Sequence, residues 1–260
     1  MSELHDNVQR WRVVCAYDGH DFCGWQSQPD GSGVQDRLEQ RLAEMTKNPV
    51  RIHGSGRTDA GVHALGQVFH FDLDWPHAAE KLHKALQATL PDSLLIRSVR
   101  KAAASFHARH STCGKRYTYT CHVGHALPQV VRYLWALPDK PLAVEAMRAA
   151  AAHLLGEHDF TSFGAWPRDA AEQGNPVKTI WRLDLTERGR HLTFTVEGSG
   201  FLYKMVRSMV GTLVAVGQGR LAASAIPELL QQQQRVPAIV TAPPQGLCLD
   251  HVFYRQPKSP

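Results

Sequence analysis

Segments with strand-like and helix-like residue patterns alternate irregularly along this chain. Residues 11–17 and 67–73 are rich in β-branched and aromatic side chains, which is typical of strands. Between them, residues 34–47 carry apolar side chains at helical spacing, and Ser32 and Gln35 have the spacing of a capping box before that helix. Because hairpins are mixed with helices in no regular β-α-β order, the pattern predicts an α+β fold with mostly antiparallel sheets.

The remaining chain continues this mixture. We expect helices over residues 77–90, 142–155 and 201–216, strands over 93–100, 106–110, 115–123 and 247–254, and a hairpin that joins 180–185 to 191–196. The segment with the weakest pattern, 101–105, separates two predicted α+β domains, 1–104 and 105–260. A chain of 260 residues is long enough for two domains and buries enough surface to fold without disulfides or a metal.

Composition narrows the class of protein. The net charge of +5 and the pI near 9.0 favour a partner that carries phosphates, although many enzymes are equally basic. The start of the chain lacks the basic and apolar regions of a secretory signal, and no apolar run reaches the ~18 residues of a membrane span. The five cysteines are widely spread without a Cys-x-x-Cys pair, so we expect free thiols in a cytoplasmic protein with no membrane partner.

The most unusual segment is HGSGRTDAGVHA at residues 53–64. Three glycines in eight residues predict a loop that needs a positive φ or a close approach of another chain segment. From spacing alone, a tight turn in which Asp59 caps the backbone and Arg57 is solvated explains the segment. The glycine spacing matches neither a dinucleotide-binding loop nor a P-loop.

The histidines and serines offer no standard catalytic set. His-Glu-x-x-His is absent, and His63, His70, His107 and His110 do not have the spacing of a metal site, so we expect no metal. Gly-x-Ser-x-Gly is also absent, which argues against a serine hydrolase.

Two basic features lie further along the chain. In the helix predicted over 201–216, Lys204, Ser208 and Gly211 lie opposite the apolar face. Arg207 lies at the edge of that face, where periodicity alone indicates an ordinary boundary arginine. Residues 106–117 combine basic side chains with aromatic ones, including Tyr117. That mixture suits RNA binding, and it equally suits a half-exposed strand with a packed tyrosine.

Six motifs taken together resemble the bacterial tRNA pseudouridine synthase A family, over about residues 11 to 254. They are YDGHDFCGWQ at 17–26, GRTDAGVHA at 56–64, FHAR at 106–109, GEHDF at 156–160, FLYKMVR at 201–207 and PPQGL at 243–247. The chain departs from the family at Ser199, where asparagine is more frequent, and at Lys204, where histidine is frequent. Neither departure falls on a catalytic position of the motifs.

The resemblance implies an enzyme that isomerises uridine to pseudouridine at positions 38, 39 and 40 in the anticodon stem-loop of tRNA. It implies two ferredoxin-like halves flanking a basic RNA-binding cleft, a homodimer, and no cofactor, since substrate and product contain the same atoms. Asp59 would be the nucleophile or the group that accepts a proton, and whether it attacks the sugar or the base stays open. Arg207 would keep Asp59 ionised, Arg57 would assist base extrusion, and Tyr117 would stack on the uracil.

Two other classes of protein stay open. A nucleoside or glycoside hydrolase could use Asp59, although such enzymes usually pair two carboxylates and the motif offers one. A non-catalytic RNA-binding module would bind tRNA without any need for Asp59. An assay for released uracil, pseudouridine or neither separates the three.

Overall fold

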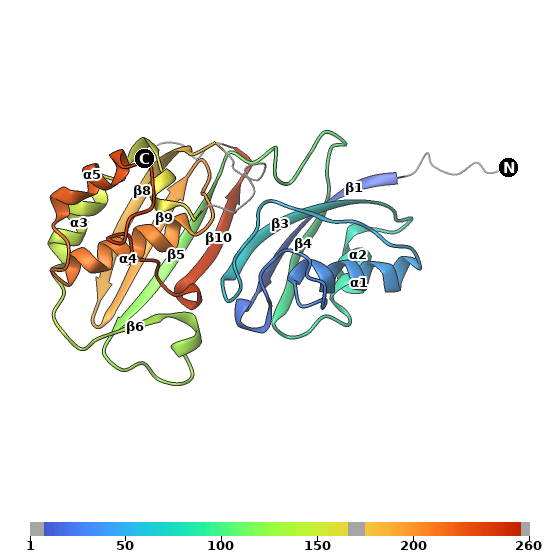
Figure 1. Cartoon of the computed structure of the whole chain (residues 1–260). Coiled ribbons are helices and arrows are strands. Elements are labelled where there is room, and N and C mark those ends of the chain that lie inside the picture. Colours follow the sequence, from blue (N-terminus) through green and yellow to red (C-terminus); the bar gives the residue numbers. More distant parts are fainter. Residues whose placement is uncertain (1–7, 166–174, 256–260) are drawn as a thin grey trace. The chain divides into compact units, whose positions relative to one another are not determined.

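Figure 1 shows the computed structural model, which describes residues 8–165 and 175–255. The chain forms two compact units. The first unit contains residues 1–112 together with 249–260, and the second unit contains 113–248. The division into domains 1–104 and 105–260 concerns which segments fold independently, and it stays a prediction.

In the first unit, helices cover one face of an antiparallel sheet. Its strands are β1 (Val8–Tyr17), β2 (His53–Gly54), β3 (His63–Asp74), β4 (Leu94–Lys101) and the larger part of β10 (Leu247–Phe253), in the order β4-β1-β3-β10, with β2 paired to β3. The helices α1 (Val34–Thr46) and α2 (Ala79–Gln87) lie side by side (Figure 1). Their leucines are fully buried, as are Trp11 and Phe69 of the sheet, so this contact forms the core.

The second unit repeats this two-layer plan with more helices. Its sheet has the order β5-β9-β8-β7, built from β5 (Gly114–Val123), β9 (His191–Gly198), β8 (Val177–Arg188) and β7 (Gly156–Asp159), and the short β6 (Trp135–Leu137) pairs parallel to β5. The helices α3 (Val144–Ala152), α4 (Met205–Gly217) and α5 (Ile226–Gln231) lie together on one face of it (Figure 1). Short 3-10 turns occur at Gly19–Asp21, Val131–Tyr133, Thr161–Phe163, Ala223–Ala225 and Pro244–Gly246.

The predicted α+β class with mostly antiparallel pairing is confirmed. Most predicted elements are present, and the predicted hairpin is β8–β9, whose last paired residues are Arg188 and His191. Within the described residues, no helix is both long and apolar enough to cross a membrane.

Two predictions about the first unit were wrong. The helix α1 is capped at Gly33 and not at Ser32, because the Asp36 carboxylate accepts the backbone N–H groups of Gly33 and Gln28. Residues 106–110 form a turn and not a strand. The reason is a side-chain contact: His107 Nδ1 accepts the backbone N–H groups of Arg109 and His110 at 3.1 and 3.3 Å.

The helix predicted over 201–216 begins four residues later and is not amphipathic. It starts at Met205, after Lys204 in the left-handed conformation, and every residue of α4 except Arg207 is buried. Ser208 and Gly211 therefore face protein and not solvent. Because the helix is enclosed on all sides, the periodicity of its apolar residues does not identify a solvent face.

Candidate active site

Asp59 lies in a tight turn between β2 and β3 of the first unit. Its backbone carbonyl accepts the N–H of Val62 at 3.1 Å, and Gly61 completes the turn with φ +78°. This is the positive φ that the glycine-rich sequence predicts. The side chain of Asp59 is half-buried, so the turn presents a carboxylate that a substrate can reach.

The motif at 17–26 braces this turn. Trp25 N–H donates to the Thr58 carbonyl at 3.1 Å. Gly24 adopts φ +82°, and a Cβ at this position would lie 2.6 Å from the same Thr58 oxygen. Only glycine permits this approach. Two motifs that are separate in sequence therefore form one structure around Asp59.

A buried polar network fixes the segment that leads to Asp59. Gln67 of β3 donates from Nε2 to the Gly56 carbonyl at 3.0 Å, and its Oε1 accepts the Ser55 hydroxyl at 2.7 Å. The Tyr17 hydroxyl lies 2.8 Å from Thr58 Oγ1. Gln67 is fully buried, so these hydrogen bonds are shielded from water and hold the loop in one conformation.

The network contains residues that sequence reasoning did not assign to the site. One signal was available: Gln67 alternates with Phe69 and Phe71, so a polar residue falls on an apolar face of the predicted strand. The partners of Gln67 could not be identified, because they come from segments far from it in sequence.

Arg57 is exposed, two residues before Asp59, and Nε donates to Gln26 Oε1 at 3.0 Å. Gln26 is the last residue of the motif at 17–26. The bond orients the guanidinium, so the interpretation of Arg57 as a purely solvated side chain is incomplete.

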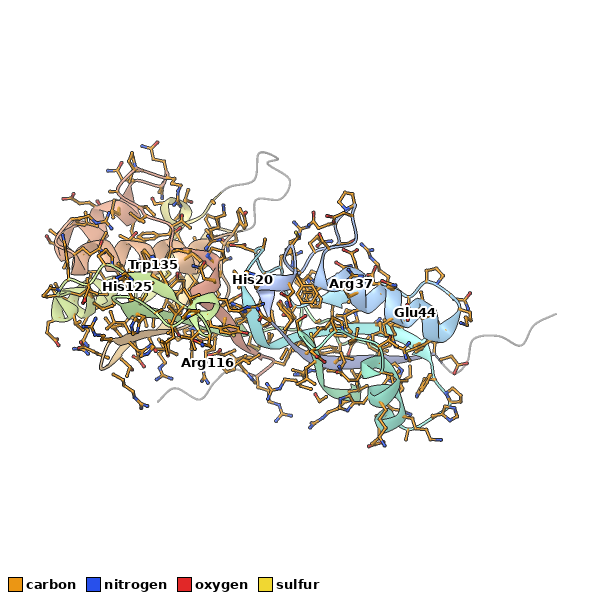
Figure 2. All side chains as sticks on the ribbon, turned by 90° about the horizontal axis from the view of Figure 1, so that it is seen from below. His20, Arg37, Glu44, Arg116, His125 and Trp135 are labelled. Carbon is orange, nitrogen blue, oxygen red and sulfur yellow. The ribbon has the colours of Figure 1, made fainter. Side chains whose placement is uncertain are left out.

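His63 follows the turn and is nearly buried. Its Nδ1 accepts the backbone N–H of Gly19 at 3.0 Å, and Asp18 Oδ1 lies 3.1 Å from the same nitrogen. The next residue of that motif, His20, is exposed (Figure 2). His63 thus connects the motif at 17–26 to β3. Within the described part of the chain, no cluster of three or more His, Cys, Asp or Glu residues could hold a metal ion.

Arg207 lies in the first turn of α4 in the second unit. Nε donates to the Ala242 carbonyl at 2.8 Å, and Ala242 N–H donates back to the Arg207 carbonyl at 3.0 Å. The side chain is partly exposed, and Arg207 is the one residue of α4 that is not buried. Arg207 therefore joins the motif at 201–207 to the segment just before the motif at 243–247.

Tyr117 projects from β5 of the same unit and is 7% exposed. The Phe201 ring packs against it edge to face, with centroids 5.3 Å apart. Two residues along the strand, the Tyr119 hydroxyl donates to the Pro243 carbonyl at 2.8 Å, and burial raises the pKa of Tyr119, which keeps that donor protonated. Tyr117 and Arg207 thus belong to one packed region of the second unit.

Arg116 lies on the other face of β5, away from the helices (Figure 2). Its Nε donates to Glu197 Oε1 at 2.8 Å, in a cross-strand ion pair with β9. Arg116 and Tyr117 are adjacent in the strand and therefore point to opposite faces of the sheet, as strand geometry requires. Of these two, Tyr117 shares a region with Arg207.

Comparison with known proteins gives a consistent result. The model of the tRNA pseudouridine synthase family matches residues 13–111 and 150–255. Three relatives carry the name tRNA pseudouridine synthase A. The protein of Exiguobacterium sibiricum is 43% identical over 96% of this chain and 99% of its own length. That of Maridesulfovibrio salexigens is 42% identical over 95% and 91%, and that of Brevibacillus brevis is 43% identical over 95% and 100%.

Among solved structures, the similarity is weaker. A chain in a crystal structure of a Cbf5-Nop10-Gar1 complex is 13% identical, with a TM-score of 0.37, over 78% of this chain and 45% of that one. A TM-score of this size supports no argument about fold or function.

Proposed function

Since the chain belongs to the tRNA pseudouridine synthase family, whose members isomerise uridine in tRNA to pseudouridine, we propose that it acts at positions 38, 39 and 40 of the anticodon stem-loop. The observation that supports this proposal most strongly is the Asp59 turn. It offers a half-buried carboxylate on a loop fixed by buried hydrogen bonds. A reaction that breaks one bond to the sugar and makes another needs a carboxylate held in one place.

The chemistry assigns Asp59 one of two roles. The bond between uracil N1 and the ribose breaks, the base turns, and C5 bonds to the same sugar carbon. As nucleophile, Asp59 attacks either the sugar or the base and is released when the new bond forms. As a base, it accepts the proton that C5 loses. Either role requires the ionised carboxylate. Atoms balance between substrate and product, so the reaction consumes no cofactor.

The other site residues are proposed to prepare the substrate. Arg207 would pair with the Asp59 carboxylate through the nitrogens that it does not use for Ala242. Arg57, oriented by Gln26, would occupy the space that the target base leaves when it is extruded. Tyr117 would contact the extruded uracil, and because 93% of its surface is already covered, we expect contact with the margin of the ring and not a fully open stacking platform.

The molecular setting follows from the same family resemblance. We propose a cytoplasmic homodimer with two ferredoxin-like halves flanking a basic RNA-binding cleft. The net charge of +5 supports the basic cleft, because tRNA binding is driven largely by its phosphates. The molecular mass in solution, measured by light scattering, tests the dimer directly.

The decisive experiment incubates the purified protein with transcribed tRNAs that carry uridine at 38, 39 or 40 and analyses the nucleosides by mass spectrometry and chromatography. Pseudouridine at these positions is the expected product. Release of free uracil would identify a hydrolase instead. Binding without either product would identify a non-catalytic RNA-binding module. Pseudouridine elsewhere in the tRNA would contradict the proposed positions while leaving the reaction intact.

A further inference from the structure

A row of basic side chains crosses the face of the first unit's sheet that the helices leave uncovered. Strand register places Arg100 of β4 opposite Arg12 of β1, Arg12 opposite His70 of β3, and His70 opposite His53 of β2. Residues directly paired across strands point to the same face of a sheet. We call these four side chains the basic row.

The turn at 107–110 extends the basic row with further basic groups. The His107 ring centroid lies 4.6 Å from that of His70 and 5.6 Å from that of His53. The His110 ring lies 4.2 Å from His107, and Arg109 between them is exposed. His70 is only 2% exposed and packs against the rings of His53 and His107, whereas His53, Arg100, Arg109 and His110 are exposed. The exposed basic side chains of the strands and the turn therefore gather on one surface.

The basic row has little compensating negative charge. Asp72, two residues after His70 on the same face of β3, is occupied by a two-point ion pair with Arg10 at 2.7 and 2.8 Å. Arg100 is exposed and has no ion pair among the described residues. Like charges directly opposite each other, such as Arg12 and Arg100, destabilise a sheet. A bound anion would relieve this repulsion.

Arg12 is also incompletely satisfied. Its guanidinium lies over the Tyr254 ring at 4.3 Å, which stabilises its charge in part. Its Nε is buried and has no hydrogen-bond partner among the described residues. A buried donor without an acceptor costs free energy, so the site favours an added acceptor.

The histidines supply donors even when they are neutral. His70 Nδ1 accepts the N–H of Ala108 at 3.1 Å, and His107 Nδ1 accepts two backbone N–H groups. The proton of each neutral ring therefore resides on Nε2. Burial lowers the pKa of His107, so this ring acts as a hydrogen-bond donor and not as a fixed charge near pH 7. Burial also lowers the pKa of His70 to about 4, and because His70 is only 2% exposed, it holds the turn through Ala108 and does not itself contact a phosphate.

We propose that the exposed side chains of the basic row and of the turn at 107–110 bind backbone phosphates of the tRNA. The inference rests on the proposed function, which supplies a polyanionic substrate. Along β3, His70 lies roughly 23 Å from His63, at about 3.3 Å per residue, and His63 follows the Asp59 turn. The surface therefore contacts RNA beyond the modified nucleotide and contributes to affinity, not to the chemical step.

Charge reversal at two exposed positions tests this inference. We expect Arg100→Glu and Arg109→Glu each to raise the Kd for unmodified tRNA at least fivefold in 0.1 M salt. Each should reduce the slope of log Kd against log salt by about 1, as expected for a lost phosphate contact. The kcat at saturating tRNA should stay within twofold of the parent value.

The matched control is Arg37→Glu. Arg37 is an exposed arginine of α1, on the helical layer of the same unit (Figure 2), so the variant changes net charge equally without touching the basic row. We expect its Kd to stay within twofold of the parent value. Equal effects of Arg37→Glu and Arg100→Glu would overturn the inference. A loss of oligomeric mass with unchanged Kd would also overturn it and would assign the surface to a protein partner.

The inference and the proposed function fail separately. If the parent protein makes no pseudouridine but Arg100→Glu still weakens tRNA binding selectively, the phosphate surface stands and the enzymatic proposal falls. If pseudouridine forms but neither Arg100→Glu nor Arg109→Glu changes the Kd for tRNA, the enzymatic proposal stands and the phosphate surface falls.

Discussion

At the scale of single residues, the proposed chemistry depends on the charge of Asp59. Asp59→Asn keeps the size of the side chain and removes the anion. We expect a loss of pseudouridine formation of roughly 1,000-fold or more with tRNA affinity retained, because nucleophiles and bases contribute at least this much to rate. Single-turnover kinetics with a gel-shift control measure both quantities. A rate above one tenth of the parent rate would contradict the assignment.

Arg207 holds Ala242 by a hydrogen bond, and its proposed second role is to pair with Asp59. We expect Arg207→Met to lower kcat roughly 100-fold, since a lost charge partner in a catalytic site typically costs this much. Arg207→Lys should recover only part of the rate, because a point charge does not reproduce the guanidinium fork.

Arg235→Met is a control for the hydrogen bond by which Arg207 holds the segment that contains Ala242. Arg235 donates to the Ile239 carbonyl and to Thr241 Oγ1, so it fixes the same segment. Similar kcat values for Arg207→Met and Arg235→Met would show that Arg207 only holds the segment.

For Tyr117, the ring and the hydroxyl are separable by substitution. Tyr117→Phe keeps the contact with Phe201 and should keep RNA affinity and most of the activity. Tyr117→Ala should lose most activity and also destabilise the second unit by about 3–5 kcal/mol, the usual cost of removing a buried aromatic ring. Activity and thermal unfolding are measured on both variants. A Tyr117→Phe enzyme as inactive as Tyr117→Ala would assign the hydroxyl a role in the reaction.

The sequence indicates the candidate site residues but not the residues that support them. Asp59, Arg57 and Arg207 lie in motifs and Tyr117 lies in the basic and aromatic segment 106–117. Gln67, in contrast, acts through Ser55 and Gly56, which lie outside its own strand. The residue pattern of a strand does not show which distant backbone group a buried side-chain amide will bond. The support of Asp59 therefore became visible only in three dimensions.

At the scale of elements, the sequence pattern predicted the helices and strands whose conformation depends mainly on neighbouring residues. Helix α1 follows from helical spacing, because its burial repeats along the sequence. Strand β3 follows from its β-branched and aromatic residues, although its central residues are buried on both faces and do not alternate in burial. The turn at 106–110 does not follow, because its conformation depends on the ring nitrogens of His107 and on the Ala108 contact with His70. These contacts override the β propensity of the segment.

This turn should make stability depend on pH. Burial lowers the pKa of His70 to about 4, so the folded state holds its neutral form. The stabilisation is complete above the ordinary histidine pKa near 6.5 and is lost as pH falls from there toward 4, because the unfolded chain then binds the extra proton. We expect a loss of about 1–3 kcal/mol across this window.

Urea unfolding between pH 8 and pH 4 measures this loss. His70→Gln can still accept the Ala108 N–H through its amide oxygen and should flatten the pH dependence. His125→Gln, at an exposed position of the second unit (Figure 2), is the control and should leave the pH dependence unchanged. Identical pH profiles for the parent and His70→Gln would contradict the prediction.

At the scale of the whole molecule, the α+β class followed from the sequence, and the connectivity of the first unit did not. Residues 249–255 belong to the first unit, although the rest of that unit precedes Cys113 in the sequence. There, the Tyr254 hydroxyl donates to the Ala108 carbonyl at 2.7 Å, and Thr112 Oγ1 donates to the Phe253 carbonyl at 3.1 Å. The residue pattern at 247–254 predicts a strand, but it does not show with which strand this segment pairs.

Because of this return, a change near residue 254 should weaken the first unit. Tyr254→Ala removes the Ala108 hydrogen bond and the ring beneath Arg12, and we expect a loss of about 3 kcal/mol. Tyr254→Phe keeps the ring and should lose about 1 kcal/mol. Hydrogen exchange, read separately on peptides from each unit, locates the effect. Increased exchange confined to peptides from 113–248 would contradict this prediction.

The discontinuous first unit also sets an order on biosynthesis. A ribosome completes the contiguous segment 113–248 before it adds the residues that the first unit still lacks. The polypeptide that carries Asp59 is thus translated early, yet its sheet gains Leu249–Phe253 only after residues 113–248 have been made. While those residues are being made, the edge of β3 is open to chaperones or to mispairing, and the first unit is completed after the second.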